Sequence, residues 1–258
     1  MSLLRLDGVA ARLGTREVLE RIDLTLDTGE VVGVIGPNGA GKSSLLRAVA
    51  GLLAVTRGEV RWHEQPLKAL SALARARAIG YLPQGPQIGW PLSVREVVAL
   101  GRRPHAGVAD RAADAQAIAT ALDEFALHEF AAREARTLSG GEQMRVHLAR
   151  LHAGQHELLL VDEPTAALDP RAQLQVLAAL RAFARQGRGV LLVLHDLALA
   201  ARYCDRLLVL ANGRPVACDS PARALNDARL ADIFGVRGLW QRDDQTEALL
   251  GITALRSP

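Results

Sequence analysis

One glycine-rich segment of the sequence has residue types that bind phosphate. It reads Gly36-Pro37-Asn38-Gly39-Ala40-Gly41-Lys42-Ser43, after the apolar run Val31 to Ile35 and before an apparent helix that starts at Ser44. A strand, a glycine-rich loop and a helix in succession are the context of a P-loop, and they argue against a chance glycine loop. Backbone N–H groups and the positive helix end would meet a polyphosphate. We expect Lys42 to neutralise the outer phosphates and the Ser43 hydroxyl to bind Mg²⁺.

A pair of carboxylates follows a later apolar run. Residues 157–161 read Glu-Leu-Leu-Leu-Val, typical of a strand buried on both faces, and Asp162-Glu163 comes directly after them. Ligands of open parallel sheets bind at such carboxyl ends. We expect Asp162 to hold Mg²⁺ mainly through water beside Ser43, and Glu163 to orient and deprotonate an attacking water. Without the P-loop, a solvated strand end would be an equally good interpretation.

Two more polar side chains end predicted strands. Gln84 follows the short apolar run 79–82, and His195 follows the run 190–194. Either residue alone would more often be structural, but together with the P-loop they place four strand ends around one phosphate site. We expect Gln84 to sense Mg²⁺ and the attacking water, and His195 to contact the γ-phosphate.

A second anion-binding helix start is predicted at residues 138–143, which read Leu-Ser-Gly-Gly-Glu-Gln. Ser139, Gly140 and Gly141 precede a helical stretch that contains Val146 and Ala149, and backbone N–H groups at such a start bind anions. Alone, Ser-Gly-Gly would more often be a flexible turn. Its place before a helix, ahead of Asp162-Glu163, favours a phosphate contact.

Hydrophobic patterning predicts the elements that position these residues. We expect strands at 3–9 and 18–26, antiparallel and beside the P-loop strand, with Ile22, Leu24 and Leu26 on one face. Further strands are predicted at 58–62, 206–210 and 215–217, and helices at 69–78, 93–100, 111–132 and 170–186. Ser93 and Glu96 would form a capping box, and residues 220–258 would be helix, turn and tail.

The middle third lacks strand alternation, so we expect one α/β domain over residues 1–258 with an inserted helical subdomain. The core would span roughly 1–85 and 155–258, and the insertion roughly 86–154. Next to the P-loop strand lies a predicted antiparallel β subdomain.

Composition excludes several classes of protein. Hydrophobic residues make up 49% and charged residues 23% of the 258, as in folded globular proteins. No apolar run approaches the ~18 residues of a membrane span. The 31 basic and 28 acidic residues are interspersed, so the net charge of +3 does not by itself indicate nucleic acid. Cys204 and Cys218 lack metal or redox spacing and are interpreted as packing residues.

The ordered motifs resemble those of ATP-binding cassette ATPases over essentially the whole chain. The motifs are the P-loop, Gln84, residues 138–143, residues 159–164, Ala167-Leu168-Asp169 and His195. The resemblance implies a P-loop NTPase fold and ATP hydrolysis with Mg²⁺. ATP would be bound by Gly36, Pro37, Asn38, Gly39, Ala40, Gly41, Lys42, Ser43 and Ser44, with Ser139, Gly140, Gly141 and Asp169 also contributing.

In that family the signature serine and glycines face a second cassette. The resemblance therefore implies a head-to-tail homodimer with two ATP molecules between the subunits. Residues 97–105 and 195–206 are also similar to importer cassettes for iron-siderophores, haem or vitamin B12. Gln84 to His105 would border the groove for the permease's coupling helix.

The implied partners are an integral membrane permease dimer and, indirectly, a periplasmic or extracellular binding protein, with no nucleic acid. The cassette would then be peripheral on the cytoplasmic face of the inner membrane.

Two departures from the family pattern concern the nucleotide. Residues 11–16 read Ala-Arg-Leu-Gly-Thr-Arg where an aromatic residue usually stacks on adenine, so Leu13 or an arginine plane would have to substitute. Met144 stands where Gln is common. A soluble cassette acting on ribosomes or DNA is the alternative, although such chains generally carry two cassettes or a coiled-coil insertion. An exporter cassette would normally be fused to membrane helices.

Overall fold

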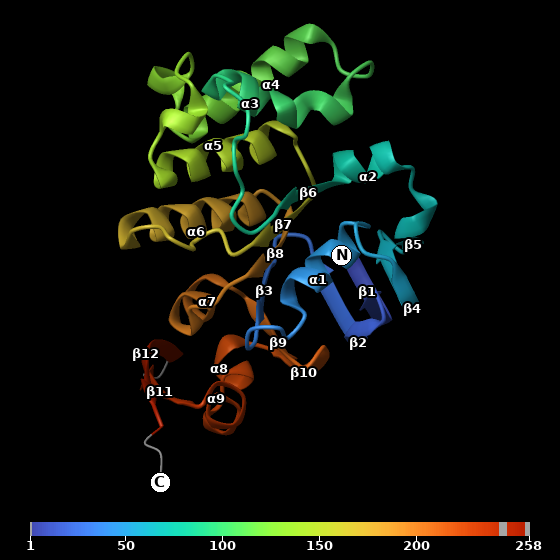
Figure 1. The fold of residues 1–258 in the computed structure, drawn as a ribbon, viewed down its shortest axis with the longest axis vertical. Helices are drawn as coiled ribbons and strands as arrows, with labels where there is room; N and C mark the ends of the chain where they lie inside the picture. The colour runs from blue at the N-terminus through green and yellow to red at the C-terminus, as the bar shows by residue number, and fades with distance from the viewer. Residues whose placement is uncertain (1, 243–246, 256–258) are drawn as a thin grey trace.

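The computed structural model describes residues 2–242 and 247–255 (Figure 1). The strands are β1 Ser2–Leu13, β2 Arg16–Asp27, β3 Val31–Ile35, β4 Val55–Trp62, β5 Gln65–Pro66, β6 Ile79–Leu82, β7 Leu158–Asp162, β8 Gly189–Val193, β9 Arg206–Ala211, β10 Arg214–Asp219, β11 Val236–Arg242 and β12 Glu247–Ala254. The helices are α1 Lys42–Val49, α2 Ala72–Ala78, α3 Val94–Ala99, α4 Arg111–Glu124, α5 Gly140–Ala153, α6 Pro170–Arg185, α7 Leu197–Tyr203, α8 Pro221–Ala224 and α9 Asp227–Phe234. Short 3-10 helices are η1 Leu67–Ala69, η2 Leu100–His105, η3 His128–Phe130 and η4 Ala135–Thr137.

The central sheet carries the strands that the sequence predicts to be buried. Its order is β10-β9-β3-β8-β7-β6, and all neighbours are parallel except β10 and β9. Every residue of β3, β7 and β8 is buried, which explains their continuous apolar runs. Because β3, β8, β7 and β6 are consecutive in the sheet, their carboxyl ends form one edge.

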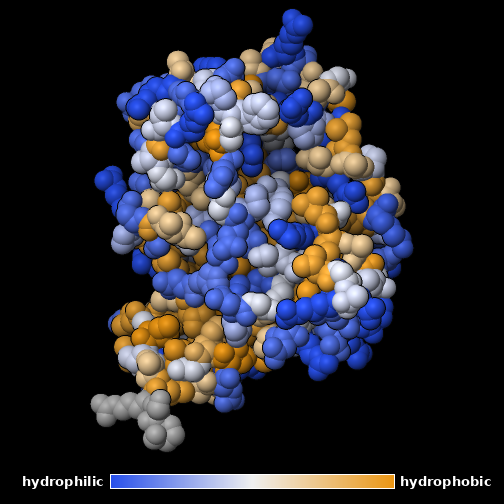
Figure 2. All heavy atoms as spheres, viewed as in Figure 1, coloured by the Kyte–Doolittle hydropathy of each residue, from blue (hydrophilic) through white to orange (hydrophobic). Residues whose placement is uncertain are grey.

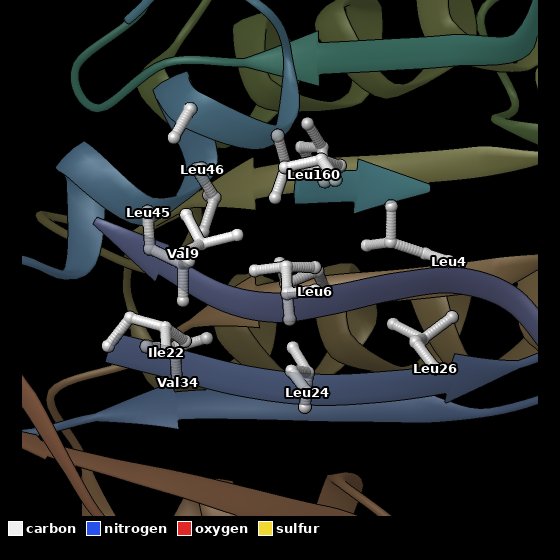
Figure 3. Close-up of a cluster of buried hydrophobic side chains, with 14 of the residues drawn as sticks. Leu4, Leu6, Val9, Ile22, Leu24, Leu26, Val34, Leu45, Leu46 and Leu160 are labelled. Carbon is white, nitrogen blue, oxygen red and sulfur yellow. The ribbon is translucent and has the colours of Figure 1, made fainter. Parts of the chain in front are cut away.

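A second sheet, β2-β1-β4-β5, is antiparallel and packs beside the first, as predicted. Ile22, Leu24 and Leu26 of β2 point into a hydrophobic cluster with side chains of β1 and α1 (Figure 3). Leu45 and Leu46 of α1 are fully buried in this cluster. The helix after the P-loop is therefore held between the two sheets.

The helices α3, α4 and α5 lie together above the central sheet in the view of Figure 1 and share a hydrophobic cluster of their own. Ser93 and Glu96 form the predicted capping box at the start of α3. The prediction of a helix over 111–132 is wrong beyond Glu124, because α4 ends there and Ala126 adopts φ 49°. A left-handed residue cannot continue a right-handed helix.

The predicted C-terminal tail is instead a β-hairpin, β11–β12, as far as the described residues reach. Trp240 and Leu249 pack toward α7 and its neighbours, whereas Leu239, Leu250 and Ile252 are exposed. Figure 2 shows apolar residues gathered at the lower left of this face, over the C-terminal elements of Figure 1. The last part of the predicted tail, 256–258, lies outside the described residues.

Within residues 2–242 and 247–255, no helix combines the length and the apolarity that a membrane span requires. Both cysteines are free; Cys204 is buried in the core, and Cys218 is half-buried and accepts a hydrogen bond from Arg206. Burial raises the pKa of the Cys204 thiol to about 12, which fits a packing role.

Candidate functional site

The P-loop turns sharply between β3 and α1. Gly36 has φ 152°, and a Cβ built on it would lie 2.1 Å from the backbone oxygen of Leu210. Gly41 caps α1 with φ 100°, and its Cβ would lie 2.6 Å from the backbone oxygen of Val18. Only glycine can adopt these angles at such close approach. The loop therefore packs closely against β9 and β2.

Lys42 lies beneath this loop with 6% of its surface exposed. Its Nζ donates hydrogen bonds to the carbonyl oxygens of Gly36 at 2.8 Å and Pro37 at 3.0 Å. Burial lowers the pKa of the ammonium group, and the nearby carboxylates Glu163 and Asp162 act in the opposite direction. The Lys42 ammonium group is thus held against the loop, close enough to both carboxylates to be influenced by their charge.

Asp162, at the end of β7, is 2% exposed. Burial raises the pKa of its carboxyl, and a hydrogen bond with the Ser43 hydroxyl opposes this shift. Its Oδ1 is buried and makes no hydrogen bond to any residue that the structure describes. A bare carboxylate oxygen beside a hydroxyl fits Mg²⁺, which takes few protein oxygens and completes its shell with water and phosphate.

The described residues contain no cluster of three or more His, Cys, Asp or Glu side chains that could hold a metal ion.

Glu163 joins two of the predicted strand-end residues. Its Oε2 accepts a hydrogen bond from Gln84 Nε2 at 2.7 Å, and its Oε1 contacts His195 Nε2. The backbone of Glu163 is in the left-handed region at φ 51° and its N–H donates to the carbonyl oxygen of Val193 at 3.2 Å. A non-glycine residue there is strained and persists where several contacts hold it. The structure thus places Gln84, Glu163 and His195 together.

These groups line a cavity of about 600 Å³. Besides the P-loop residues 38–44, Gln84, Glu163 and His195, the walls include Arg16, Glu17, Val18, Asn212 and Gly213. Sequence reasoning gave no binding role to Asn212 and Gly213, which form the turn between β9 and β10, or to Glu17 and Val18. Hydrogen bonds from Glu20 N to Gly213 O and from Gly213 N to Ala40 O hold that turn against β2 and the P-loop. No local motif could have indicated this contact.

Ser139 begins α5 away from that cavity. Its hydroxyl and the Glu142 carboxylate form a capping box with an Oγ to Oε2 distance of 2.8 Å, which lowers the pKa of Glu142. Ser139 and Gly141 instead line a second groove of about 300 Å³, together with Asp169, the N-cap of α6. No residue that the structure describes lines both hollows. Within one chain, the signature residues and the P-loop are not brought together.

Comparison with known proteins identifies the class that this fold and site define. The family model described as ABC transporter matches residues 19–166. The chain is 46% identical to "Hemin import ATP-binding protein HmuV" of Pseudomonas entomophila over 93% of this chain and 95% of that protein. It is 44% identical to the protein of the same name from Myxococcus xanthus, covering 91% and 90% of the two chains. A solved ATP-binding subunit of an ABC transporter aligns with a TM-score of 0.76 at 30% identity, covering 92% and 95%.

The chain therefore belongs to the ABC transporter family. It is an ATPase of that family, built on the P-loop NTPase fold.

Proposed function

We propose that this chain is the ATP-hydrolysing subunit of an importer that takes up haem. The observation that carries the proposal is the similarity to hemin import ATP-binding proteins over almost the whole chain, at 46% identity with the Pseudomonas entomophila protein. Iron-siderophore and cobalamin stay alternatives as cargo, since these chelates use similar cassettes. The cassette itself would not touch the cargo.

In the proposed reaction, Glu163 accepts the proton of the water that attacks the γ-phosphate. The bonds from Gln84 and His195 hold the carboxylate in place, so the water meets a base whose position is set before ATP arrives. Lys42 would leave the loop carbonyls to neutralise the phosphates, and His195 would contact the γ-phosphate. Mg²⁺ held by Ser43 and Asp162 would supply further charge neutralisation.

The same reaction would need a second copy of the chain. Ser139, Gly140 and Gly141 begin a helix whose N–H groups can bind phosphate, yet they lie away from their own P-loop. A head-to-tail homodimer would bring this end of α5 onto the partner's ATP. Asp169, beside Ser139, would then also approach the second nucleotide.

The permease would contact the segment from Gln84 to His105. Trp90 in this segment is 75% exposed, and Val108 just beyond it is 70% exposed. Both apolar side chains are thus accessible to a partner protein. The partner would be a permease dimer in the membrane, fed by a periplasmic or extracellular binding protein, and the cassette would lie on the cytoplasmic face.

The test is ATP hydrolysis by the cassette reconstituted with its permease in lipid vesicles. The cognate binding protein is added empty or loaded with haem, ferric siderophore or cobalamin. Of the three cargoes, only haem on the binding protein should stimulate hydrolysis. The matched control is the complex that carries Glu163→Gln, in which no cargo should stimulate hydrolysis.

Stimulation by cobalamin or siderophore but not by haem would contradict haem as the cargo, but it would not contradict the proposal that the chain belongs to an importer. Recovery of the chain from cells with ribosomes or DNA, without any integral membrane protein, would contradict import itself. Wild-type hydrolysis by Glu163→Gln would remove the role given to Glu163.

A further inference from the structure

The sequence Gly101-Arg102-Arg103-Pro104-His105 lies in η2, and its arginine Arg102 is buried. Only 6% of Arg102 is exposed. Its Nε donates to Asp114 Oδ1 of α4 at 2.7 Å, and its Nη1 donates to the Ala153 carbonyl at 2.9 Å and to Gln155 Oε1 at 2.8 Å. One side chain therefore ties η2 to α4 and to the end of α5.

Neighbouring residues of η2 make the same connection through the backbone. His105 Nε2 lies 2.9 Å from the carbonyl oxygen of Gly154. A Cβ on Gly101 would lie 2.1 Å from the carbonyl oxygen of Arg150, so η2 rests directly on the last turn of α5. Arg77 of α2 donates to the carbonyl oxygen of Pro104 at 2.7 Å. The motif thus joins α2, α4 and α5 at one point.

The guanidinium of Arg102 suits this joint chemically. The last carbonyls of a helix carry partial negative charge, and a cation there is favourable. Arg presents several N–H donors in a fixed plane, so it can bond three acceptors at once, whereas Lys offers a point charge on a flexible stem. The Ala153 carbonyl is buried and would otherwise lack this partner, whereas Asp114 and Gln155 are also accessible to solvent.

The other end of α5 begins at Ser139. The helix has 14 residues, so at 1.5 Å per residue it is about 21 Å long. A tilt of about 5° at the Arg102 end would move the Ser139 end by roughly 2 Å. Misplacement of about 1 Å can lower a reaction rate on the order of a hundredfold.

We infer that Arg102 is a positioning residue for ATP hydrolysis, which sets the angle of α5 and so the place of Ser139 at the partner's nucleotide. This inference rests on the proposed head-to-tail dimer. It also implies that the segment proposed to contact the permease, Gln84 to His105, is rigidly connected to α5, the helix that begins with the signature residues.

The experiment compares wild type, Arg102→Met, Arg102→Lys and the double variant Arg102→Met with Asp114→Asn. The control is Arg111→Met, an exposed arginine on the same helix as Asp114. Each purified chain is assayed for Mg-ADP affinity, which needs only its own P-loop, for kcat of ATP hydrolysis and for thermal unfolding. Wild-type hydrolysis is also measured against protein concentration.

Arg102→Met should lower kcat about ten- to hundredfold, with the Kd for Mg-ADP within about twofold of wild type. The kcat of Arg102→Lys should fall between those of wild type and Arg102→Met. The kcat of Arg111→Met should match that of wild type. In the double variant the unpaired carboxylate is gone, so thermal stability should recover in part, while kcat should stay low because the Ala153 and Gln155 contacts are still missing.

Recovery of kcat together with stability in the double variant would overturn the inference, because Arg102 would then be merely structural. A folded Arg102→Met chain with wild-type kcat would do the same. The dimer proposal fails separately, if the wild-type rate rises only in proportion to protein concentration at every concentration.

Discussion

At the scale of single residues, the site depends on side chains that are held before nucleotide binds. Gln84 and His195 reach Glu163 from the ends of β6 and β8, on the two sides of β7. Hydrogen bonds to a carboxylate reduce its freedom, so less ordering remains for the reaction step. The strained backbone of Glu163 is consistent with this, since such strain concentrates at functional sites.

We propose that Arg16 binds the nucleotide base. It lines the phosphate cavity, and its side chain makes no hydrogen bond or ion pair with the described part of the chain. Leu13, the other candidate from the sequence, is 59% exposed and does not line the cavity. A guanidinium plane over an aromatic ring contributes about 0.5 to 2 kcal/mol.

Arg16→Ala should therefore weaken Mg-ADP binding about two- to thirtyfold, while binding of Mg-pyrophosphate, which has no base, should not change. Calorimetric titration with both ligands measures this. Arg12→Ala is the matched control, as an exposed arginine of β1 that does not line the cavity. Equal losses for both ligands would mean that Arg16 acts on the phosphates and not on the base.

At the scale of elements, the P-loop packs against β9 at Gly36 and against β2 at Gly41, and neither contact leaves room for a side chain. Its glycines differ in what surrounds them. Gly36 has φ 152°, and a Cβ on it would meet backbone at 2.1 Å, whereas Gly39 has φ 77° and a Cβ there would meet nothing within 4 Å. The first glycine is thus required by both angle and space, and the second by angle alone.

Gly36→Ala should abolish nucleotide binding and lower the free energy of unfolding by more than about 2 kcal/mol, because β9 must move. Gly39→Ala should cost only about 1 kcal/mol, from the left-handed angle. Urea denaturation and ADP titration of both variants give the comparison. If the two variants prove equally stable, the close approach to Leu210 does not constrain the loop.

At the scale of the whole molecule, buried histidines make stability depend on pH. Burial lowers the pKa of His147 and of His156 to about 4 from the ordinary 6.5, and positive charge on Arg150 adds to the shift of both. Both side chains are more than nine-tenths buried by surface area. The ring nitrogens of His147 make no well-aligned hydrogen bond with the described residues, although the Pro86 carbonyl weakly favours the charged form.

The unfolded chain takes up protons near pH 6.5, whereas the folded chain resists them until about pH 4. The contribution of these two histidines to the free energy of unfolding is therefore fully present above pH 6.5, and it falls as the pH drops from 6.5 toward 4. Each histidine contributes a loss of about 2 kcal/mol between about pH 7 and about pH 5. His147→Leu should reduce that loss by about 2 kcal/mol, as measured by urea denaturation at both pH values. His128→Leu, a change of an exposed histidine, serves as control. An unchanged pH dependence in His147→Leu would contradict the buried neutral state.

The sequence predicted the elements around the site well where local chemistry specifies them. The Ser93 and Glu96 capping box, the buried strands and the polar residues at their ends follow from short-range patterns. Prediction was weaker where contacts are distant. The end of α4 and the hairpin β11–β12 depend on packing against other elements, which no window of sequence contains.

By itself, the sequence determined the phosphate-binding loop, the carboxylate pair at the end of β7 and the family, because glycine spacing and strand ends are local properties. Only the tertiary structure decided that Arg16, not Leu13, lines the cavity, and that Arg102 is a buried joint at the end of α5. Those outcomes depend on strand register and on contacts between residues 51 positions apart, such as Arg102 and Ala153. Burial of this kind is set by the packing of whole elements.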